Sequence, residues 1–221
     1  MAQLITGLDA RLVRANLERV RETIAEATPA GRDPADVEVL CAVKYVPGDE
    51  LGVLAEAGVT LLGENRAQEL ARKAEAWAVR AGFTWDFIGH LQSRKVRQVL
   101  PYARYLHSVA SDSVLRQLER HATAETEVLV EVNVAGDQTK SGIAPGELGA
   151  FIARCPARVV GLMTMPPLAG RPEDSRRHFA ALAQLAADHG LRELSMGTTQ
   201  DYSVAVEEGA TIVRLGSVLL R

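Results

Sequence analysis

The sequence predicts an α/β protein, a single (β/α)8 barrel of the TIM type with an additional amino-terminal helix. Eight short apolar segments alternate with stretches of helical periodicity, which is typical of a parallel sheet. The length of 221 residues falls in the range of one such barrel, so we expect one domain over residues 1–221. No G-x-G-x-x-G follows the first apolar segment, which disfavours the main alternative, an open doubly wound sheet.

An amphipathic helix is expected first. Apolar residues recur at helical spacing from Leu8 to Ile24, and the pattern ends before Pro29 and Gly31. Because the chain stops directly after the eighth strand, we expect this helix to take the place of a final barrel helix.

The expected strands are nearly continuous in hydrophobicity, as strands buried on both faces are. They cover residues 37–43, 59–63, 85–89, 104–109, 128–134, 159–163, 191–196 and 211–216. Helices are expected between them, over residues 49–57, 65–80, 94–100, 112–122, 145–155, 173–189 and 200–207. The longest of these helices carries Phe179, Leu182 and Ala186 on one face, with Glu173 at its start and Gly190 after its end.

Composition limits the classes of function. The net charge of −3 and the pI near 6.0 give no electrostatic reason to expect a nucleic acid or an anionic membrane as partner. The amino terminus lacks a signal-peptide core, and the most apolar stretch, 159–170, is short and rich in Pro and Gly. Cys41 and Cys155 have no metal-type spacing. We therefore expect a cytoplasmic protein.

Lys44 follows the first apolar strand, which is closed by Pro47. Barrel enzymes place their chemistry at the carboxyl ends of the strands. An apolar strand end would partly desolvate the ammonium group, and desolvation favours the neutral amine, the nucleophile of Schiff-base chemistry. Taken alone, a strand-end lysine is more often a solvated loop residue.

The segment SMGTTQD, after the seventh strand, is the second candidate. Gly197 permits close approach of the backbone, Thr198 and Thr199 offer hydroxyls, and the following helix points its amides at the same place. Gly216 and Ser217 supply a second small-residue turn after the eighth strand. Together they predict a phosphate site, which barrels often have at this position. A simple helix cap is the alternative, and one arrangement can serve both roles.

Further polar residues lie near strand ends. Arg214 is near the end of the last strand, where a buried guanidinium needs a carboxylate or a ligand, and an ion pair is the expectation in isolation. His90 follows the third strand, where it is either a general base or a structural histidine. Asn65 follows the second strand, where it either contacts the ring of a ligand or caps a helix. Lys140 is expected in a solvated loop at the rim, and an anion site is the alternative.

Two polar residues, His107 and Glu131, fall within expected strands and are interpreted as interior residues of the barrel without an assigned role. The sequence contains no H-E-x-x-H, C-x-x-C, P-loop or G-x-S-x-G motif. Metal and serine-nucleophile chemistry are therefore unsupported.

One ordered set of motifs in the sequence resembles that of a known family. The motifs are AVKYVP, GENRAQEL, WDFIGHLQSRK, LHSV, KSGI, GLMTMPP, LSMGTTQDYSVAVEEGAT and VRLGS. The sequence resembles the pyridoxal phosphate homeostasis protein family, single-domain relatives of the alanine racemase N-terminal barrel, from the first helix to the last strand.

The resemblance implies a barrel that binds pyridoxal 5′-phosphate (PLP) as a Schiff base. It assigns cofactor-binding roles to Lys44, Asn65, His90, Ser195, Met196, Gly197, Thr198, Thr199, Arg214, Gly216 and Ser217. The chain departs from the family at 43–47, where Ser-Lys-Thr-Lys-Pro is frequent, and at 198–199, where Met-Ser is usual; the hydroxyl of Thr199 is retained.

The function that the resemblance implies is PLP homeostasis, in which the protein carries or buffers the cofactor without strong catalysis. PLP-dependent apo-enzymes are the candidate recipients, and we expect a monomer. A PLP-dependent amino-acid racemase is the alternative, but it needs an acid/base group on each face of the carbanion. In racemase-type enzymes, the resemblance implies, one of these groups is a tyrosine supplied through a second domain and a dimer partner. Tyr45 neighbours Lys44, but adjacent residues of a strand point to opposite sides, so it should face away from the pocket. A cationic Arg214 at the pyridine nitrogen would weaken the ring as an electron sink.

A third hypothesis is a Schiff-base aldolase that acts on a sugar phosphate without PLP. The lysine and the phosphate site would serve it equally well. Against it, such an enzyme needs a further acid/base pair near the lysine, and the strand ends offer only His90 as a clear candidate.

Overall fold

The computed structural model describes residues 4–77, 82–137, 139–167 and 170–221. Its strands are β1 Glu38–Ala42, β2 Leu61–Glu64, β3 Thr84–Phe87, β4 Tyr105–Val109, β5 Glu127–Glu131, β6 Arg158–Met163, β7 Glu193–Thr198 and β8 Ile212–Leu215. They form one closed barrel in consecutive order, and every pairing is parallel. The predicted (β/α)8 barrel is confirmed, and all eight predicted strands overlap an observed one.

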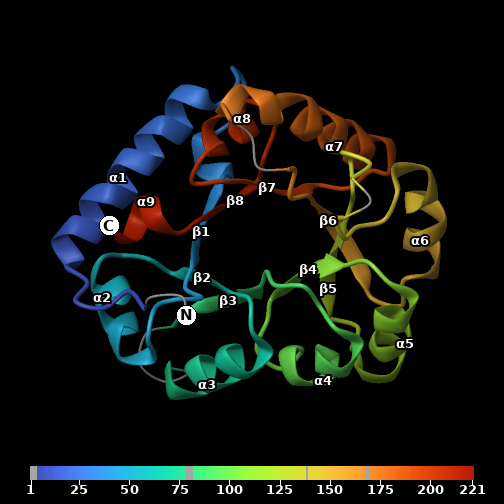
Figure 1. Ribbon diagram of the computed structural model, residues 1–221, viewed down its shortest axis with the longest axis horizontal. Helices are drawn as coiled ribbons and strands as arrows, with labels where there is room; N and C mark the ends of the chain where they lie inside the picture. The colour runs from blue at the N-terminus through green and yellow to red at the C-terminus, as the bar shows by residue number, and fades with distance from the viewer. Residues whose placement is uncertain (1–3, 78–81, 138, 168–169) are drawn as a thin grey trace.

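The helices lie outside the barrel (Figure 1). They are α1 Ala10–Ala27, α2 Leu51–Glu56, α3 Ala67–Trp77, α4 Val96–Val99, α5 Asp112–His121, α6 Leu148–Arg154, α7 Arg176–Asp188, α8 Tyr202–Glu207 and α9 Ser217–Leu220. Short 3-10 turns precede several of them, namely η2 Gly48–Glu50, η3 Ser93–Lys95, η4 Pro145–Glu147 and η5 Pro172–Ser175, and η1 Pro34–Asp36 follows α1. The last residues of the helix predicted over 65–80 lie outside the described residues.

The amino-terminal helix α1 begins at a side-chain cap. Asp9 Oδ1 accepts hydrogen bonds from the backbone N–H groups of Arg11 and Leu12, at 2.7 and 3.2 Å. The buried face of the helix, with Val13, Leu17, Val20 and Ile24, packs into the core.

The strand β8 is followed by the short helix α9, which the sequence did not lead us to expect. The Asn16 side chain, 3% exposed, donates from Nδ2 to the carbonyl oxygens of Leu219 and Arg221, both at 3.1 Å. A helix of four residues offers little apolar surface of its own. Helix α1 packs on α9 and lies between α8 and α2 in the ring of helices (Figure 1), which is the place expected for it.

Two layers of side chains make up the interior. Apolar residues fill the space between the barrel and the helices, whereas the inside of the barrel also holds the buried polar residues Asp86, His107, Ser195 and Arg214. In the part of the chain that the structure describes, no helix is long and apolar enough to cross a membrane.

Candidate functional site

Lys44 lies in a turn just beyond β1, which ends at Ala42. Its side chain is exposed, and its Nζ lies 4.8 Å from the centroid of the Tyr45 ring. The expectation that the strand partly buries this amine is wrong, because the strand ends before Lys44. The side chains of Lys44 and Tyr45 lie against each other in this turn, because side chains alternate only within extended strands. That Tyr45 faces away from the pocket stays a prediction.

A buried ion pair holds the turn that carries Lys44. Lys73 Nζ, on α3, lies 2.6 Å from Glu64 Oε2 and donates to the carbonyl oxygen of Val43 at 2.8 Å. Their side chains are 1% and 0% exposed. Glu64 Oε1 accepts from the next two backbone N–H groups, at 2.8 and 3.2 Å. Sequence reasoning missed this pair, although the position of Lys73 three residues after the buried Leu70 was a signal.

The turns after β7 and β8 touch each other. Thr199 Oγ1 accepts a hydrogen bond of 3.4 Å from the backbone N–H of Gly216. Gly197 has a φ of 88°, and a Cβ added there would lie 2.6 Å from the Cβ of Ala205. Gly197 therefore packs closely on helix α8, and the approach of its backbone to a phosphate stays a prediction.

The side chain of Asp201 accepts hydrogen bonds that hold the turn after β7. Its Oδ1 accepts from the backbone N–H of Thr198 at 2.8 Å and from the Thr198 hydroxyl at 3.1 Å, and its Oδ2 accepts from Ser175 Oγ at 2.9 Å. Asp201 precedes α8 but makes no side-chain cap there. The hydroxyl of Thr198 is thus engaged within the turn.

Ser195 and Met196 lie deeper than the sequence suggested. Both are 0% exposed inside β7, whereas the turn begins beyond Thr198. The Ser195 hydroxyl contacts Arg214 and His107 rather than the turn. The expectation of one continuous turn from Ser195 to Thr199 is corrected accordingly, because the strand extends further than its apolar pattern indicates.

Arg214 is buried inside the barrel at 7% exposed. Its Nη1 donates to the backbone oxygen of Ser195 at 2.7 Å and to Ser195 Oγ at 2.5 Å, and its Nη2 donates to the carbonyl oxygen of Thr164 at 2.9 Å. Burial lowers the pKa of Arg214 to about 10, so the group remains a cation at neutral pH. The ion pair expected for Arg214 in isolation is replaced by hydrogen bonds to uncharged oxygens.

The loops after β2 and β3 approach each other at Asn65 and Gly89. A Cβ added to Gly89 would lie 2.1 Å from the carbonyl oxygen of Asn65. Asn65 Oδ1 is buried and has no hydrogen-bond partner, which marks an unsatisfied acceptor at this end of the barrel. His90 and Ser217 are exposed.

A cavity of about 390 Å³ lies at the carboxyl ends of the last strands. Gly197, Thr198 and Arg214 line it, together with Met165 and the exposed Lys140 of the rim. The candidate residues after β1, β2 and β3 do not line this cavity. A second cavity, of about 430 Å³, lies at the opposite end, beside the start of β1 and β2.

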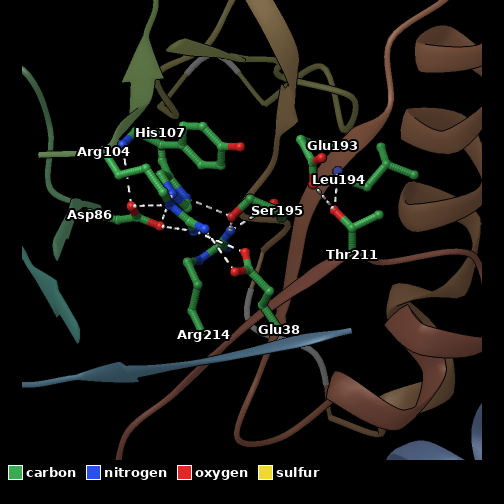
Figure 2. Close-up of polar contacts among 10 residues, drawn as sticks. Glu38, Asp86, Arg104, His107, Glu193, Leu194, Ser195, Thr211 and Arg214 are labelled. Carbon is green, nitrogen blue, oxygen red and sulfur yellow. Dashed lines mark hydrogen bonds and ion pairs between the residues drawn. The ribbon is translucent and has the colours of Figure 1, made fainter. Parts of the chain in front are cut away.

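The interior placement expected for His107 and Glu131 is confirmed, with exposed fractions of 0% and 8%. His107 contacts Ser195 and Asp86 (Figure 2). Glu131 Oε1 accepts from Ser141 Oγ at 2.6 Å. Within the described ranges, no group of three or more His, Cys, Asp or Glu side chains is placed to hold a metal ion.

Comparison with known proteins gives close relatives over nearly the whole chain. The pyridoxal phosphate homeostasis protein of Aquifex aeolicus is 37% identical over 217 residues, which cover 92% of this chain and 95% of the relative. The structure of PipY of Synechococcus elongatus with PLP bound has a TM-score of 0.80 and 27% identity, over 95% of this chain and 100% of PipY.

Alanine racemase from Corynebacterium glutamicum shares the fold alone. Its TM-score is 0.69 at 15% identity, and the match covers 99% of this chain and 62% of the racemase. No family model matches the chain.

Proposed function

From the premise that the chain belongs to the pyridoxal phosphate homeostasis protein family, we propose that it binds PLP and serves in the homeostasis of that cofactor. The observation that carries this proposal is the identity of 37% to a relative of that name over almost its full length. The PLP-bound structure of PipY, with the same barrel, supports it.

The residues at the carboxyl end of the barrel fit PLP. A buried cation, Arg214, lines the cavity, and the buried Asn65 Oδ1 has no partner within the protein. The positive φ of Gly197 and the contact between Thr199 and Gly216 bring small residues and backbone N–H groups to one place. A ring that carries both a phosphate and polar substituents needs such a set of groups.

Lys44 is the residue that we assign to the covalent bond. Bound PLP supplies an aldehyde, which the amine of a lysine holds as a Schiff base. Lys44 follows β1, and Cys41 in β1 pairs with Leu215 in β8. An added Cβ on Gly216 would lie 3.9 Å from the carbonyl oxygen of Ala42. The turn that carries the amine therefore lies beside the turn after β8.

The phosphate, we propose, is bound by the turns after β7 and β8. Gly197, Thr198 and Thr199 form the first turn, and Gly216 and Ser217 form the second. The Thr199 hydroxyl and the Gly216 amide, 3.4 Å apart, are the groups that join them. Main-chain N–H groups in such turns form concave sites for anions.

Arg214 favours holding the cofactor over catalysis. A guanidinium facing the pyridine nitrogen keeps that nitrogen unprotonated, which weakens the ring as an electron sink. The three acceptors of Arg214 are uncharged oxygens, so its positive charge is not neutralised by a direct carboxylate contact. We therefore propose a carrier or buffer of PLP rather than a racemase.

The finer parts of the proposal concern partners and location. We propose that the protein acts as a monomer in the cytoplasm and passes PLP to PLP-dependent apo-enzymes. Light scattering of the purified protein tests the monomer. Activation of an apo-enzyme by the PLP-loaded protein, with a trap for free PLP present, tests the transfer.

The decisive experiment is a comparison of Lys44→Ala with Lys95→Ala. Lys95 lies in η3, where it contacts Gln98. We expect the wild-type protein and Lys95→Ala to take up PLP and show the visible absorbance of a Schiff base, and Lys44→Ala to lack this absorbance. A wild-type protein that takes up no PLP refutes the proposal. Racemisation of alanine or serine at an enzyme-like rate would support the racemase, and cleavage of a sugar phosphate without PLP would support the aldolase.

A further inference from the structure

A row of hydrogen bonds crosses the inside of the barrel and connects four strands (Figure 2). Arg214 Nη1, on β8, lies 2.5 Å from Ser195 Oγ on β7. Ser195 Oγ lies 2.8 Å from Nδ1 of His107 on β4. His107 Nε2 lies 3.1 Å from Oδ2 of Asp86 on β3. All four side chains are buried, and we refer to these residues as the interior row.

Asp86 is the end of the interior row that lies away from Arg214, and other residues hold its carboxylate in place. Arg104 donates to both of its carboxylate oxygens, at 3.0 and 2.8 Å, and the backbone N–H of Tyr105 donates at 3.2 Å. Burial alone raises the pKa of Asp86, but hydrogen bonds from His107 and Arg104 outweigh it and hold that pKa below its ordinary value. An ionised carboxylate only accepts hydrogen bonds, so His107 must donate from Nε2.

The surroundings of His107 favour the neutral imidazole. Burial lowers the pKa of His107 below its ordinary value, and the contact with Asp86 offsets this only in part. The charged groups that act on it are the Asp86 carboxylate and the guanidinium groups of Arg104 and Arg214. With its proton on Nε2, a neutral imidazole has a lone pair on Nδ1. Ser195 must therefore donate its hydroxyl proton to His107.

Because the Ser195 hydroxyl donates its proton to His107, its oxygen is an acceptor towards Arg214. With its proton directed at His107, the Ser195 hydroxyl turns its lone pairs to the guanidinium, which donates to it at 2.5 Å. Every hydrogen bond in the interior row then points from the cation towards the carboxylate. Arg214 uses three of its five N–H donors on Ser195 and Thr164, which leaves two for a ligand.

We propose that Ser195, His107 and Asp86 are positioning residues, which hold Arg214 in one orientation towards the ring of the bound cofactor. The inference rests on the proposed function and deepens it. Arg214 is linked to a carboxylate only through two neutral groups, so its orientation is fixed while its positive charge stays directed at the ring nitrogen.

The first test examines the interior row in the protein without added cofactor. Nitrogen NMR of ¹⁵N-histidine-labelled protein distinguishes the two tautomers of His107, with His107→Asn used to assign the signals. We expect a neutral ring with its proton on Nε2 at pH 7. A cationic ring, or a proton on Nδ1, would overturn the inference, because Ser195 would then have no acceptor at His107.

The second test compares two variants of one residue. His107→Asn places an amide oxygen near the position of Nδ1 and retains an acceptor for Ser195, whereas His107→Phe keeps a ring and removes it. We expect His107→Phe to bind PLP about tenfold more weakly than the wild type, and His107→Asn to bind within about threefold of it. Ser195→Ala, which cuts the row next to Arg214, should resemble His107→Phe.

The third measurement is one that lost stability alone would not change. In Ser195→Ala the midpoint of the pH titration of the visible absorbance should shift by about one pH unit, because a misplaced Arg214 lets the ring nitrogen protonate. The Schiff-base absorbance itself should remain, since Lys44 is intact. Variants that match the wild type in both affinity and pH midpoint overturn this inference alone. A wild-type protein that takes up no PLP overturns the proposed function and this inference together.

Discussion

Thr199 is the residue whose hydroxyl joins the two proposed phosphate turns, at 3.4 Å from the Gly216 amide. We expect Thr199→Ala to retain PLP about 10- to 150-fold less well, because a hydrogen bond to a charged group contributes about 1.5–3 kcal/mol. The visible absorbance should persist, since Lys44 is unchanged. Dialysis of loaded protein followed by absorbance measures retention, and Thr199→Ser, which keeps the hydroxyl, is the control. Equal retention in the alanine variant would remove Thr199 from the phosphate site.

Gly197 is the residue at which the backbone itself is the constraint. Its φ of 88° is unfavourable for an L side chain, and an added Cβ would lie 2.6 Å from the Cβ of Ala205. We expect Gly197→Ala to lower the free energy of unfolding by about 1–3 kcal/mol, measured by urea denaturation. Gly146→Ala is the matched control, because it has no positive φ and nothing within 4 Å of the new atom. A similar loss in both variants would contradict this account.

At the scale of elements, helix α3 fixes the turn after β1 through the buried pair of Lys73 and Glu64. Lys73→Met leaves the Glu64 carboxylate buried without its cation. We expect this to lower the free energy of unfolding by about 3–5 kcal/mol. Urea denaturation measures the loss.

The same helix provides the control for this prediction. Arg72 pairs with Glu69 at 2.8 Å, but its side chain is 57% exposed. Arg72→Met should therefore change stability by less than about 1 kcal/mol. If the two variants lost equal stability, the burial of the Lys73 pair would not explain its effect.

The sequence and the structure agree best on the elements and least on their ends. Strands buried on both faces leave long apolar runs, and these runs located all eight strands. The end of β1 was placed too late because Val43 is as apolar as the strand, although it begins the turn that Lys73 holds. The end of β7 was placed too early because Gly197 is a poor strand former, yet Gly197 and Thr198 both continue the strand. Contacts between distant residues decided both boundaries.

In the candidate site too, the local sequence indicates the turn residues but not the hydrogen bonds between distant strands. Gly197, Thr199 and Gly216 carry local signals of a turn, and the structure brings Thr199 and Gly216 together. Ser195 carries no such signal, because its partners His107 and Arg214 lie on other strands. A pattern within one segment cannot indicate a hydrogen bond to a strand that closes the barrel much later in the sequence.

For the molecule as a whole, the buried polar interior makes stability depend on pH. The pKa of His107 is lowered in the folded protein, mainly by burial, from an ordinary value of about 6.5. Below that value the unfolded chain binds a proton that the folded chain does not, so the free energy of unfolding decreases as the pH falls. For one histidine, the loss between pH 7 and pH 5 is at most about 2 kcal/mol. At still lower pH the lowered pKa of Asp86 adds to the loss in the same direction.

Substitution of His107 isolates its share of this pH dependence. In His107→Asn the group that titrates is absent, so the curve of unfolding free energy against pH should be flatter between pH 7 and pH 5, even if its overall level is lower. His178 is the matched control, because burial also lowers its pKa, but its side chain is only partly buried whereas that of His107 is fully buried. His178→Gln should therefore retain most of the dependence of the unfolding free energy on pH. Urea denaturation at several pH values measures all three proteins. If His107→Asn kept the full slope, His107 would already be protonated in the folded barrel, and the hydrogen bonds between Asp86 and Arg214 would not all point the same way.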